Sequence, residues 1–185
     1  MYKIAAFIEF DKKITQKILN QKKIVKKKFG NQTYLNHLPH CSIYVFNTKK
    51  KNLNEIKKKK YISISKSKAF ILEKTDIFYN DPITKKNTYF LKIKKNNFLK
   101  KLQKSVLKTF SKYSYKKELR FGNKIMNKNY RSFGYPFINL NWKPHFTIAS
   151  ISLNKDQFKF IQDFKKISIS KNQTLKYIYL YQIKT

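Results

Sequence analysis

Pro39-His40-Cys41-Ser42-Ile43 and Pro144-His145-Phe146-Thr147-Ile148 are two copies of one pattern: proline, histidine, any residue, a hydroxyl residue and isoleucine. Each copy runs on into residues typical of strands, which predicts motif strands at 40–46 and 145–151. Side chains two apart on a strand point to the same face. We therefore expect each histidine to stand beside the hydroxyl residue of its own copy, with Cys41 and Phe146 on the opposite face.

This pairing of side chains has a chemical meaning. An imidazole titrates near neutrality, and a hydroxyl can donate a hydrogen bond to an anionic oxygen. Two such pairs facing one another could bind a phosphate and supply both the base and the acid that cleave it. The alternative is that His40 and His145 are structural histidines at the starts of half-buried strands. The duplicated proline and isoleucine favour the functional interpretation, because chance matches that long are rare.

The two motifs resemble those of the 2H phosphoesterase superfamily, which includes 2′-5′ RNA ligase-like proteins and 2′,3′-cyclic phosphodiesterases. Ser42 stands where that family more often has threonine, a change that keeps the hydroxyl. The resemblance implies two α+β lobes with antiparallel sheets, related by a pseudo-twofold axis, with both motifs lining the cleft between them. It also implies that His40 and His145 are catalytic and that Ser42 and Thr147 bind phosphate.

Composition indicates one folded domain over residues 1–185. Hydrophobic residues make up 41% and aromatic residues 16% of the 185 positions, too many for a disordered chain. The single cysteine, Cys41, excludes an internal disulfide. We find neither a membrane-spanning run nor a signal peptide, so we expect an intracellular (cytoplasmic) monomer without membrane association.

The formal net charge is +34, and 41 of the 43 basic residues are lysine. Asn, Ile, Phe and Tyr are also abundant, as in AT-biased coding sequences, so part of this charge is open to explanation by codon usage. Whatever its origin, such a surface attracts polyanions in a salt-dependent way. Lysine contacts phosphates as a point charge, which predicts an RNA or nucleotide partner bound without base reading.

The apolar pattern along the chain predicts an α+β fold with seven or eight strands and three or four helices. Strands are expected at 2–10, 40–46, 61–65, 68–78, 88–94, 145–151 and 174–183. Helices are expected at 12–28, 97–112 and 155–166, with a short helix or a loop at 47–60. Antiparallel pairing of 69–79 with 88–94 is the simplest topology through the turn that begins at Asn80.

Helix faces and caps follow from the same pattern. In 12–28, we expect Asp11 to cap the helix, lysines to face solvent and Gly30 to end it. Its predicted inward residues are Ile14, Ile18, Ile24 and Val25. In 97–112, Asn96 or Asn97 is the expected cap. The predicted inward residues there are Phe98, Leu99, Leu102, Val106 and Phe110, and those of 155–166 are Phe158, Ile161 and Phe164.

The stretch 113–141 has a weak pattern and is predicted to be a long substrate loop. In it, Arg131 beside Tyr130 could clamp a phosphate and stack on a base, although Phe133 and Phe137 could equally pin the loop to the core. Lys143 is a further candidate substrate contact. His37 is interpreted as an ordinary loop histidine, with phosphate binding as the alternative. No cluster shows metal-ligand spacing, so neither a metal nor a cofactor is expected.

The sequence therefore predicts a metal-independent phosphodiesterase that hydrolyses 2′,3′-cyclic phosphate RNA ends or related cyclic or 2′-5′ nucleotides. The reverse reaction, formation of a 2′-5′ bond, stays open, as does the assignment of acid and base to the two histidines. The main alternative of another class is a non-catalytic RNA-binding protein that keeps the fold. A basic ribosome-associated protein is a third option, but it leaves the duplicated motif unexplained.

Overall fold

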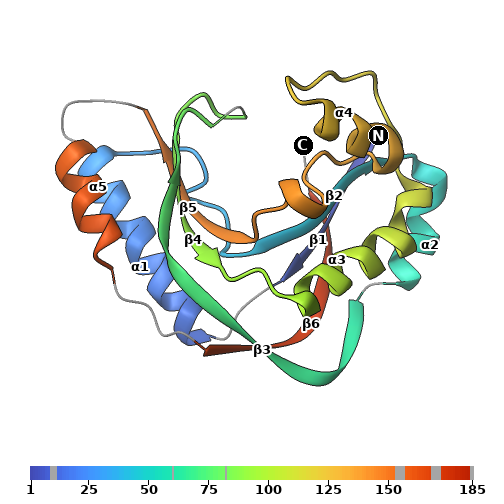
Figure 1. Cartoon of the computed structure of the whole chain (residues 1–185), viewed down its shortest axis with the longest axis horizontal. Coiled ribbons are helices and arrows are strands. Elements are labelled where there is room, and N and C mark those ends of the chain that lie inside the picture. Colours follow the sequence, from blue (N-terminus) through green and yellow to red (C-terminus); the bar gives the residue numbers. More distant parts are fainter. Residues whose placement is uncertain (9–11, 60, 82, 153–156, 168–171, 184–185) are drawn as a thin grey trace.

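The two motif strands lie at the two edges of a curved six-stranded sheet. In the computed structural model, the strand order is β2-β1-β6-β3-β4-β5 and all neighbours pair antiparallel (Figure 1). The structure describes residues 1–8, 12–59, 61–81, 83–152, 157–167 and 172–183. The strands are β1 (Tyr2–Ile8), β2 (Cys41–Thr48), β3 (Tyr61–Phe78), β4 (Asn87–Ile93), β5 (His145–Ile151) and β6 (Asn172–Ile183).

Strand β3 joins the two lobes of the molecule. It is 18 residues long; its first part pairs with β6 and its last part with β4, so two antiparallel sheets share it. The sequence predicted two strands here, at 61–65 and 68–78, and this was wrong. The pairing only shifts register between Ser63 and Lys68, and the strand continues through the irregularity. For this reason the described residues form fewer strands than predicted.

Five α-helices cover the sheets, not the three or four that were predicted. They are α1 (Lys12–Phe29), α2 (Leu53–Lys58), α3 (Asn97–Phe110), α4 (Lys124–Phe133) and α5 (Gln157–Lys165), with 3-10 turns at Lys50–Asn52, Ser111–Tyr113 and Asn139–Asn141. In Figure 1, α1 and α5 lie beside β3, β4 and β5, whereas α2, α3 and α4 gather on the side of β2.

The predicted loop over 113–141 contains helix α4, so that prediction was wrong. The side chain of Asn123 caps the helix by accepting hydrogen bonds from the amides of Ile125 and Met126. Gly134 ends it in the left-handed region, at φ 72°. Both signals are present in the sequence, but the helix is short and carries few apolar residues, so its periodicity is weak.

Helix α1 packs by a stripe that includes a lysine. Ile14, Ile18 and Val25 are buried as predicted, but Ile24 is 49% exposed and Lys22 is only 4% exposed. Positions 14, 18, 22 and 25 follow one another at spacings of four, four and three, so they share one helix face. The predictions for Ile24 and for an all-solvent lysine face were therefore wrong. The predicted cap Asp11 lies outside the described residues, and Gly30 ends the helix at φ 68°.

The other helix predictions are largely confirmed. Asn96 caps α3 by accepting from the Leu99 amide at 2.9 Å. The buried face of α3 includes Leu99, Leu102, Val106 and Phe110, with Phe98 partly buried. In α5, Phe164 is buried and Ile161 partly buried, and Phe160, which was not predicted, also joins the core. The side chain of Phe158 lies outside the described residues.

The outer edges of β5 and β2 each carry one further bridge. Thr33, in the loop after α1, pairs with Ser150 of β5, and Tyr115 pairs with Asn47 of β2. No helix in the part of the chain that the structure describes combines the length and apolar character needed to cross a membrane.

Candidate functional site

The histidines of the two motifs are held by the same hydrogen bond. His40 immediately precedes β2, and its Nδ1 lies 2.7 Å from the carbonyl oxygen of Leu38. His145 begins β5, and its Nδ1 lies 2.6 Å from the carbonyl oxygen of Lys143. A carbonyl oxygen only accepts, so each Nδ1 must carry a proton and each Nε2 is left for other chemistry. Two stretches half a chain apart thus present their imidazoles in the same way.

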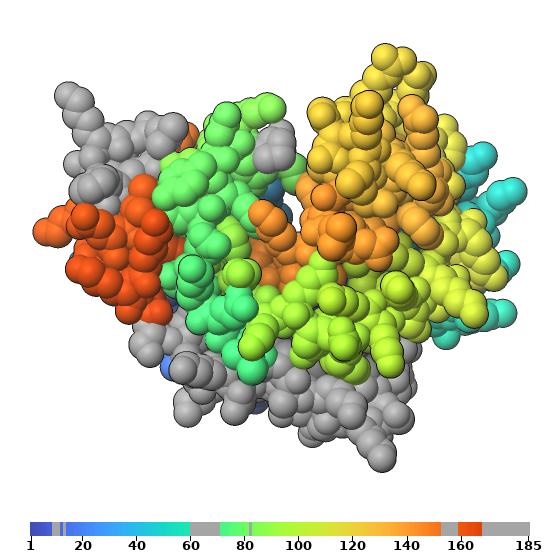
Figure 2. Space-filling model, viewed as in Figure 1, coloured from blue at the N-terminus to red at the C-terminus, as the bar shows by residue number. Residues whose placement is uncertain are grey.

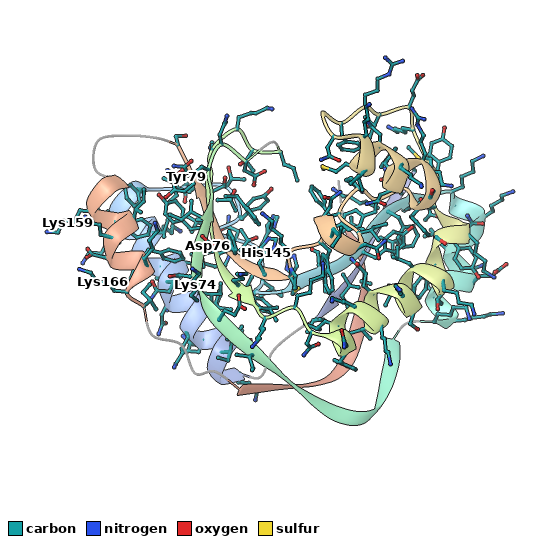
Figure 3. The ribbon with its side chains drawn as sticks, viewed as in Figure 1. Lys74, Asp76, Tyr79, His145, Lys159 and Lys166 are labelled. Atoms are coloured by element: carbon teal, nitrogen blue, oxygen red, sulfur yellow. The ribbon has the colours of Figure 1, made fainter. Side chains whose placement is uncertain are left out.

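The site lies where the molecule is hollowed between its lobes. Figure 2 shows the depression between the residues around the β3–β4 turn and those of α4, and Figure 3 places His145 at its base. His40, Ser42, His145 and Thr147 are each partly exposed, whereas Cys41 and Phe146 are fully buried. The alternation expected from strand geometry is therefore present in both copies.

Aromatic rings support both imidazoles. Phe7 of β1 stacks on His40 with ring centroids 3.8 Å apart and an interplanar angle of 26°. Phe78 and Phe90 approach His145 by their edges, with centroids 5.1 and 5.0 Å away. Each ring restricts the rotation of its histidine and excludes water from one side of it. The sequence analysis missed these residues, although alternation along β1 and β4 marks them as neighbours of the motif strands.

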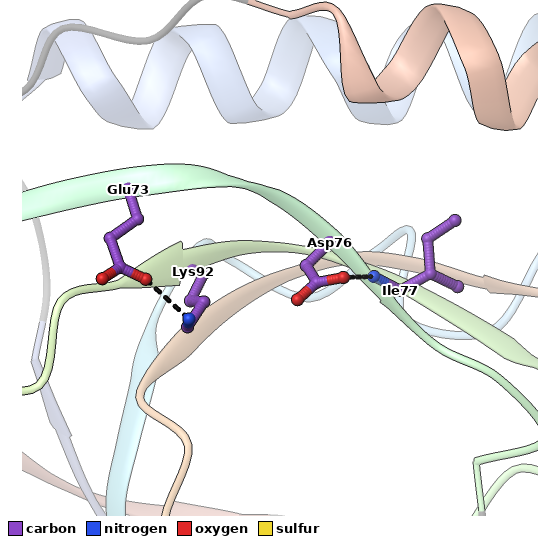
Figure 4. A network of polar contacts seen from close by, with 4 residues as sticks. All are labelled: Glu73, Asp76, Ile77 and Lys92. Carbon is purple, nitrogen blue, oxygen red and sulfur yellow. Dashed lines mark hydrogen bonds and ion pairs between the residues drawn. The ribbon is translucent and has the colours of Figure 1, made fainter.

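Two lysines stand near His145. The Nζ of Lys143 lies 5.5 Å from the centroid of Phe78, the ring that also meets His145. Lys92 is the cross-strand partner of His145 in β4, so their side chains share a face. Lys92 also forms an ion pair of 2.7 Å with Glu73 of β3 (Figure 4). Lys143 is consequently the less neutralised of the two cations.

Positive charge surrounds His40. Burial lowers the pKa of His40; the hydrogen bond to Leu38 works against this, and His37, Lys22 and His145 lower the pKa further. Lys22 is nearly buried, and its Nζ donates a hydrogen bond of 2.5 Å to the carbonyl oxygen of Tyr34. Burial lowers the pKa of Lys22 from 10.5 to about 8. The sequence analysis missed this lysine because it assigned every lysine of α1 to the solvent face.

His145 has a carboxylate in its surroundings. Burial lowers the pKa of His145, whereas the Lys143 carbonyl and the charge of Asp81 raise it and the Lys143 ammonium lowers it. Asp81 is 8% exposed and accepts hydrogen bonds from the Thr88 hydroxyl at 2.6 Å and the Ile83 amide at 2.8 Å. These bonds hold the carboxylate in place and favour its charged form.

The cysteine inside the first motif is not a nucleophile. Cys41 is fully buried, and burial raises the pKa of its thiol to about 12, although a hydrogen bond from the His145 backbone works against the shift. The reactive form of cysteine is the thiolate, which is scarce at such a pKa. Among the described residues, no three His, Cys, Asp or Glu side chains gather as metal ligands do.

The remaining predicted contacts, Tyr130 and Arg131, lie on α4 away from the motif strands. Tyr130 is 5% exposed, and its hydroxyl accepts a hydrogen bond of 3.3 Å from the Lys117 amide. This residue therefore braces the segment before α4. Arg131 is exposed and lines two surface hollows, neither of which includes a histidine. His37 is exposed in the loop before the first motif, with its ring 5.3 Å from that of Tyr34.

Comparison with known proteins yields a likeness of fold. No family model matches the chain, and no curated protein matches it in sequence. Among solved structures, protein TT0787 of Thermus thermophilus matches with a TM-score of 0.56 and 10% identity, over 98% of this chain and 87% of that one. That protein has the 2H phosphoesterase/ligase-like fold. The structure of this chain is thus similar to that fold, in agreement with the α+β, two-lobed architecture expected from the motifs.

Proposed function

We propose that this chain is a metal-independent phosphodiesterase that hydrolyses 2′,3′-cyclic phosphates at RNA ends or in related cyclic nucleotides. The observation that carries the proposal is the shared Nδ1–carbonyl hydrogen bond of His40 and His145. It fixes the ring orientation and tautomer of both imidazoles and leaves both Nε2 atoms available for proton transfer. Two histidines needed only for packing would have no reason to share this arrangement beside matching hydroxyl groups.

The chemistry follows from the protonation of the two rings. A neutral imidazole with its proton on Nδ1 accepts the proton of a water molecule at Nε2 while the water oxygen forms a bond to phosphorus. The protonated imidazole donates its Nε2 proton to the departing ribose oxygen as the bond from that oxygen to phosphorus breaks. The product is a linear phosphomonoester with a free ribose hydroxyl, and proton exchange between the rings and solvent restores the starting state.

The surroundings of the two rings assign these roles. His40 is flanked by His37 and Lys22, whose charges favour its neutral form, so we assign His40 as the general base. Asp81 favours the charged form of His145, so we assign His145 as the general acid. The rings interact, and each measured pKa will therefore belong to the pair.

The hydroxyls of Ser42 and Thr147 and the ammonium of Lys143 would act on the phosphate. Each hydroxyl stands two residues after its histidine on the same strand face, where it can donate to a non-bridging oxygen. Negative charge grows on these oxygens during attack, and fixed donors stabilise it. Lys143 adds a cation beside His145 without an ion-pair partner among the described residues.

The test is release of a nucleoside monophosphate from a nucleoside 2′,3′-cyclic phosphate in the presence of EDTA. We expect turnover by the wild type and a loss of about 10²–10⁴-fold in kcat for His40→Ala and for His145→Ala. His37→Ala is the matched control, since it removes the third histidine of the chain from an exposed loop position, and its turnover should stay of the same order.

The position of the phosphate in the product identifies the oxygen that leaves. Absence of turnover on the nucleotide and on a short RNA with a cyclic end would overturn the proposal. RNA binding that persists without turnover would then favour the non-catalytic alternative. Equal losses in His37→Ala and His40→Ala would contradict a special role for the two motif histidines.

A further inference from the structure

A basic hollow covers helix α4 and the segment 114–123 that precedes it. Two adjoining depressions form it, with volumes of about 500 and 230 Å³, and Arg131 lines both. Six basic residues contribute to the lining: Lys116, Lys117, Arg120, Lys124, Lys128 and Arg131. Glu118 is the one acidic residue among the lining residues. This basic hollow contains none of the residues assigned above to hydrolysis.

Both arginines of the chain lie in the basic hollow. The other 41 basic residues are lysines, and none is replaced by arginine anywhere else. Within the described ranges, the ion pair between Glu73 and Lys92 is the one that forms, so the six cations of the hollow have no carboxylate partner there. A guanidinium offers a planar fork of donors that fits a phosphate in two-point contact, which an ammonium cannot do.

The wall of the basic hollow is held in place. Asn127 of α4 and Phe121 exchange two hydrogen bonds, from the Phe121 amide at 2.6 Å and to the Phe121 carbonyl at 2.8 Å. Tyr130 accepts from the Lys117 amide, and its ring lies 5.4 Å from that of Phe121. These contacts fix the backbone on both sides of Arg120. The cost of ordering the segment is therefore met within the fold, which favours ligand binding.

The basic hollow is connected to the site of the histidines. The Tyr44 hydroxyl donates to the carbonyl oxygen of Phe133, the last residue of α4. Tyr44 follows His40 by four residues, about 13 Å along a strand at a rise of about 3.3 Å per residue. A chain of a few nucleotides can span the distance from the histidines to α4.

We propose that the basic hollow is a second phosphate-binding site, which holds the sugar–phosphate backbone of the RNA strand whose cyclic end lies at His40 and His145. This inference rests on the proposed function and narrows its substrate class to oligonucleotides. A mononucleotide would occupy the histidine site alone. Binding at the hollow is sequence-independent, because the backbone phosphates are the groups that it contacts.

The experiment compares variants of equal charge. Arg120→Gln/Arg131→Gln removes two positive charges from the basic hollow, and Lys57→Gln/Lys58→Gln removes two from the exposed face of α2. Arg120→Lys/Arg131→Lys keeps the charge and removes the guanidinium fork. The probe is a short single-stranded RNA with a linear 3′-phosphate, which the proposed reaction cannot cleave, and its binding is followed by fluorescence anisotropy over a range of salt concentrations.

We expect the arginine-to-glutamine pair to weaken RNA binding about tenfold and to lower the salt-dependence slope by about 1.4, or ~0.7 for each phosphate released. The lysine control should lose about twofold or less, and the arginine-to-lysine pair should lie between them. In turnover, the preference for a cyclic-ended RNA over a mononucleoside cyclic phosphate should fall by a similar factor.

Equal losses in the α2 control and the arginine pair would overturn the second site, since any two charges would then serve. Unchanged RNA binding in the arginine pair would overturn it too. The binding assay needs no turnover, so failure of the proposed hydrolysis and failure of the second site give different results. An inactive protein whose RNA binding still depends on both arginines would contradict the hydrolysis alone.

Discussion

The indole Nε1 of Trp142 donates a hydrogen bond of 3.0 Å to the carbonyl oxygen of Ser42, one hundred residues away in the chain. Trp142 is 3% exposed and lies three residues before His145, while Ser42 belongs to the first motif. The bond therefore ties the approach to one histidine to the strand of the other. The relative position of the two imidazoles depends on this contact across the base of the cleft.

Trp142→Phe should weaken both the fold and catalysis. The smaller ring leaves a cavity and an unsatisfied carbonyl, which should lower the free energy of unfolding by about 1–3 kcal/mol. A small displacement of one histidine against the other should lower kcat by about tenfold or more. Urea unfolding and turnover of a cyclic nucleotide measure the two effects. A variant that loses stability and keeps kcat would show that the bond is structural alone.

The pH profile of kcat/KM should have its maximum below pH 6.5. Burial lowers the pKa of both His40 and His145 from the ordinary value of 6.5. The base must be neutral, so activity rises with pH through the lower apparent pKa; the acid must be charged, so activity falls above the higher one. An optimum well above pH 6.5 would contradict these shifts.

Two substitutions test the assignment of acid and base. Lys22→Met removes a charge that lowers the pKa of His40, so the rising limb of the profile should move to higher pH. Asp81→Asn removes a charge that raises the pKa of His145, so the falling limb should move to lower pH. If the histidines had the opposite roles, each substitution would move the other limb.

Lys22→Met should also stabilise the protein near neutral pH. Lowering a lysine pKa from 10.5 to about 8 corresponds to a destabilisation of about 3 kcal/mol while the group is charged in both states. Below pH 8 that cost is fully present. Between pH 8 and 10.5 the unfolded chain binds more protons than the native one, so the stability of the wild type rises with pH.

The gain from Lys22→Met should therefore be largest below pH 8 and shrink at higher pH, after allowance for the lost bond to Tyr34. Urea unfolding at several pH values measures it. Lys23→Met is the matched control, because Lys23 is exposed and its replacement should change stability little at any pH. A loss of stability in Lys22→Met at neutral pH would show that the hydrogen bond outweighs the buried charge.

Removing the motif hydroxyls should slow the chemical step. Ser42→Ala and Thr147→Val each remove a donor placed beside a histidine, and we expect a loss of about 10²-fold in kcat, the scale measured for other transition-state donors. Thr147→Ser keeps the hydroxyl and should retain most activity. The kinetics of all three variants on one cyclic nucleotide give the comparison. A rise in KM with kcat unchanged would instead indicate ground-state binding.

Gly134→Ala should destabilise the protein more than Gly30→Ala. Both glycines end helices at positive φ, 72° and 68°, where an alanine costs about 1–2 kcal/mol. A Cβ at Gly134 would also overlap the Ser114 hydroxyl, whereas a Cβ at Gly30 has open space around it. Thermal or urea unfolding separates the steric part from the conformational part. Equal effects would show that Ser114 moves away without cost.

The sequence predicts the site better than it predicts the fold around it. The positions of His40, Ser42, His145 and Thr147 follow from strand alternation, which is local and independent of what packs behind the strand. Lys22 could not be placed, because a lysine on the apolar spacing of α1 looks like any solvated lysine until the loop that accepts its hydrogen bond is seen. The continuity of β3 likewise depends on pairing with β6, a strand about a hundred residues away.

The catalytic strands β2 and β5 are also the outer strands of the sheet, where unpaired backbone groups can template the addition of another chain. The bridges from Thr33 to Ser150 and from Tyr115 to Asn47 occupy part of each of these edges. Together with the high positive charge, which makes copies of the chain repel one another, they oppose the edge-to-edge association that leads to aggregation. An open cleft bordered by outer strands can thus face solvent without drawing in a neighbouring molecule.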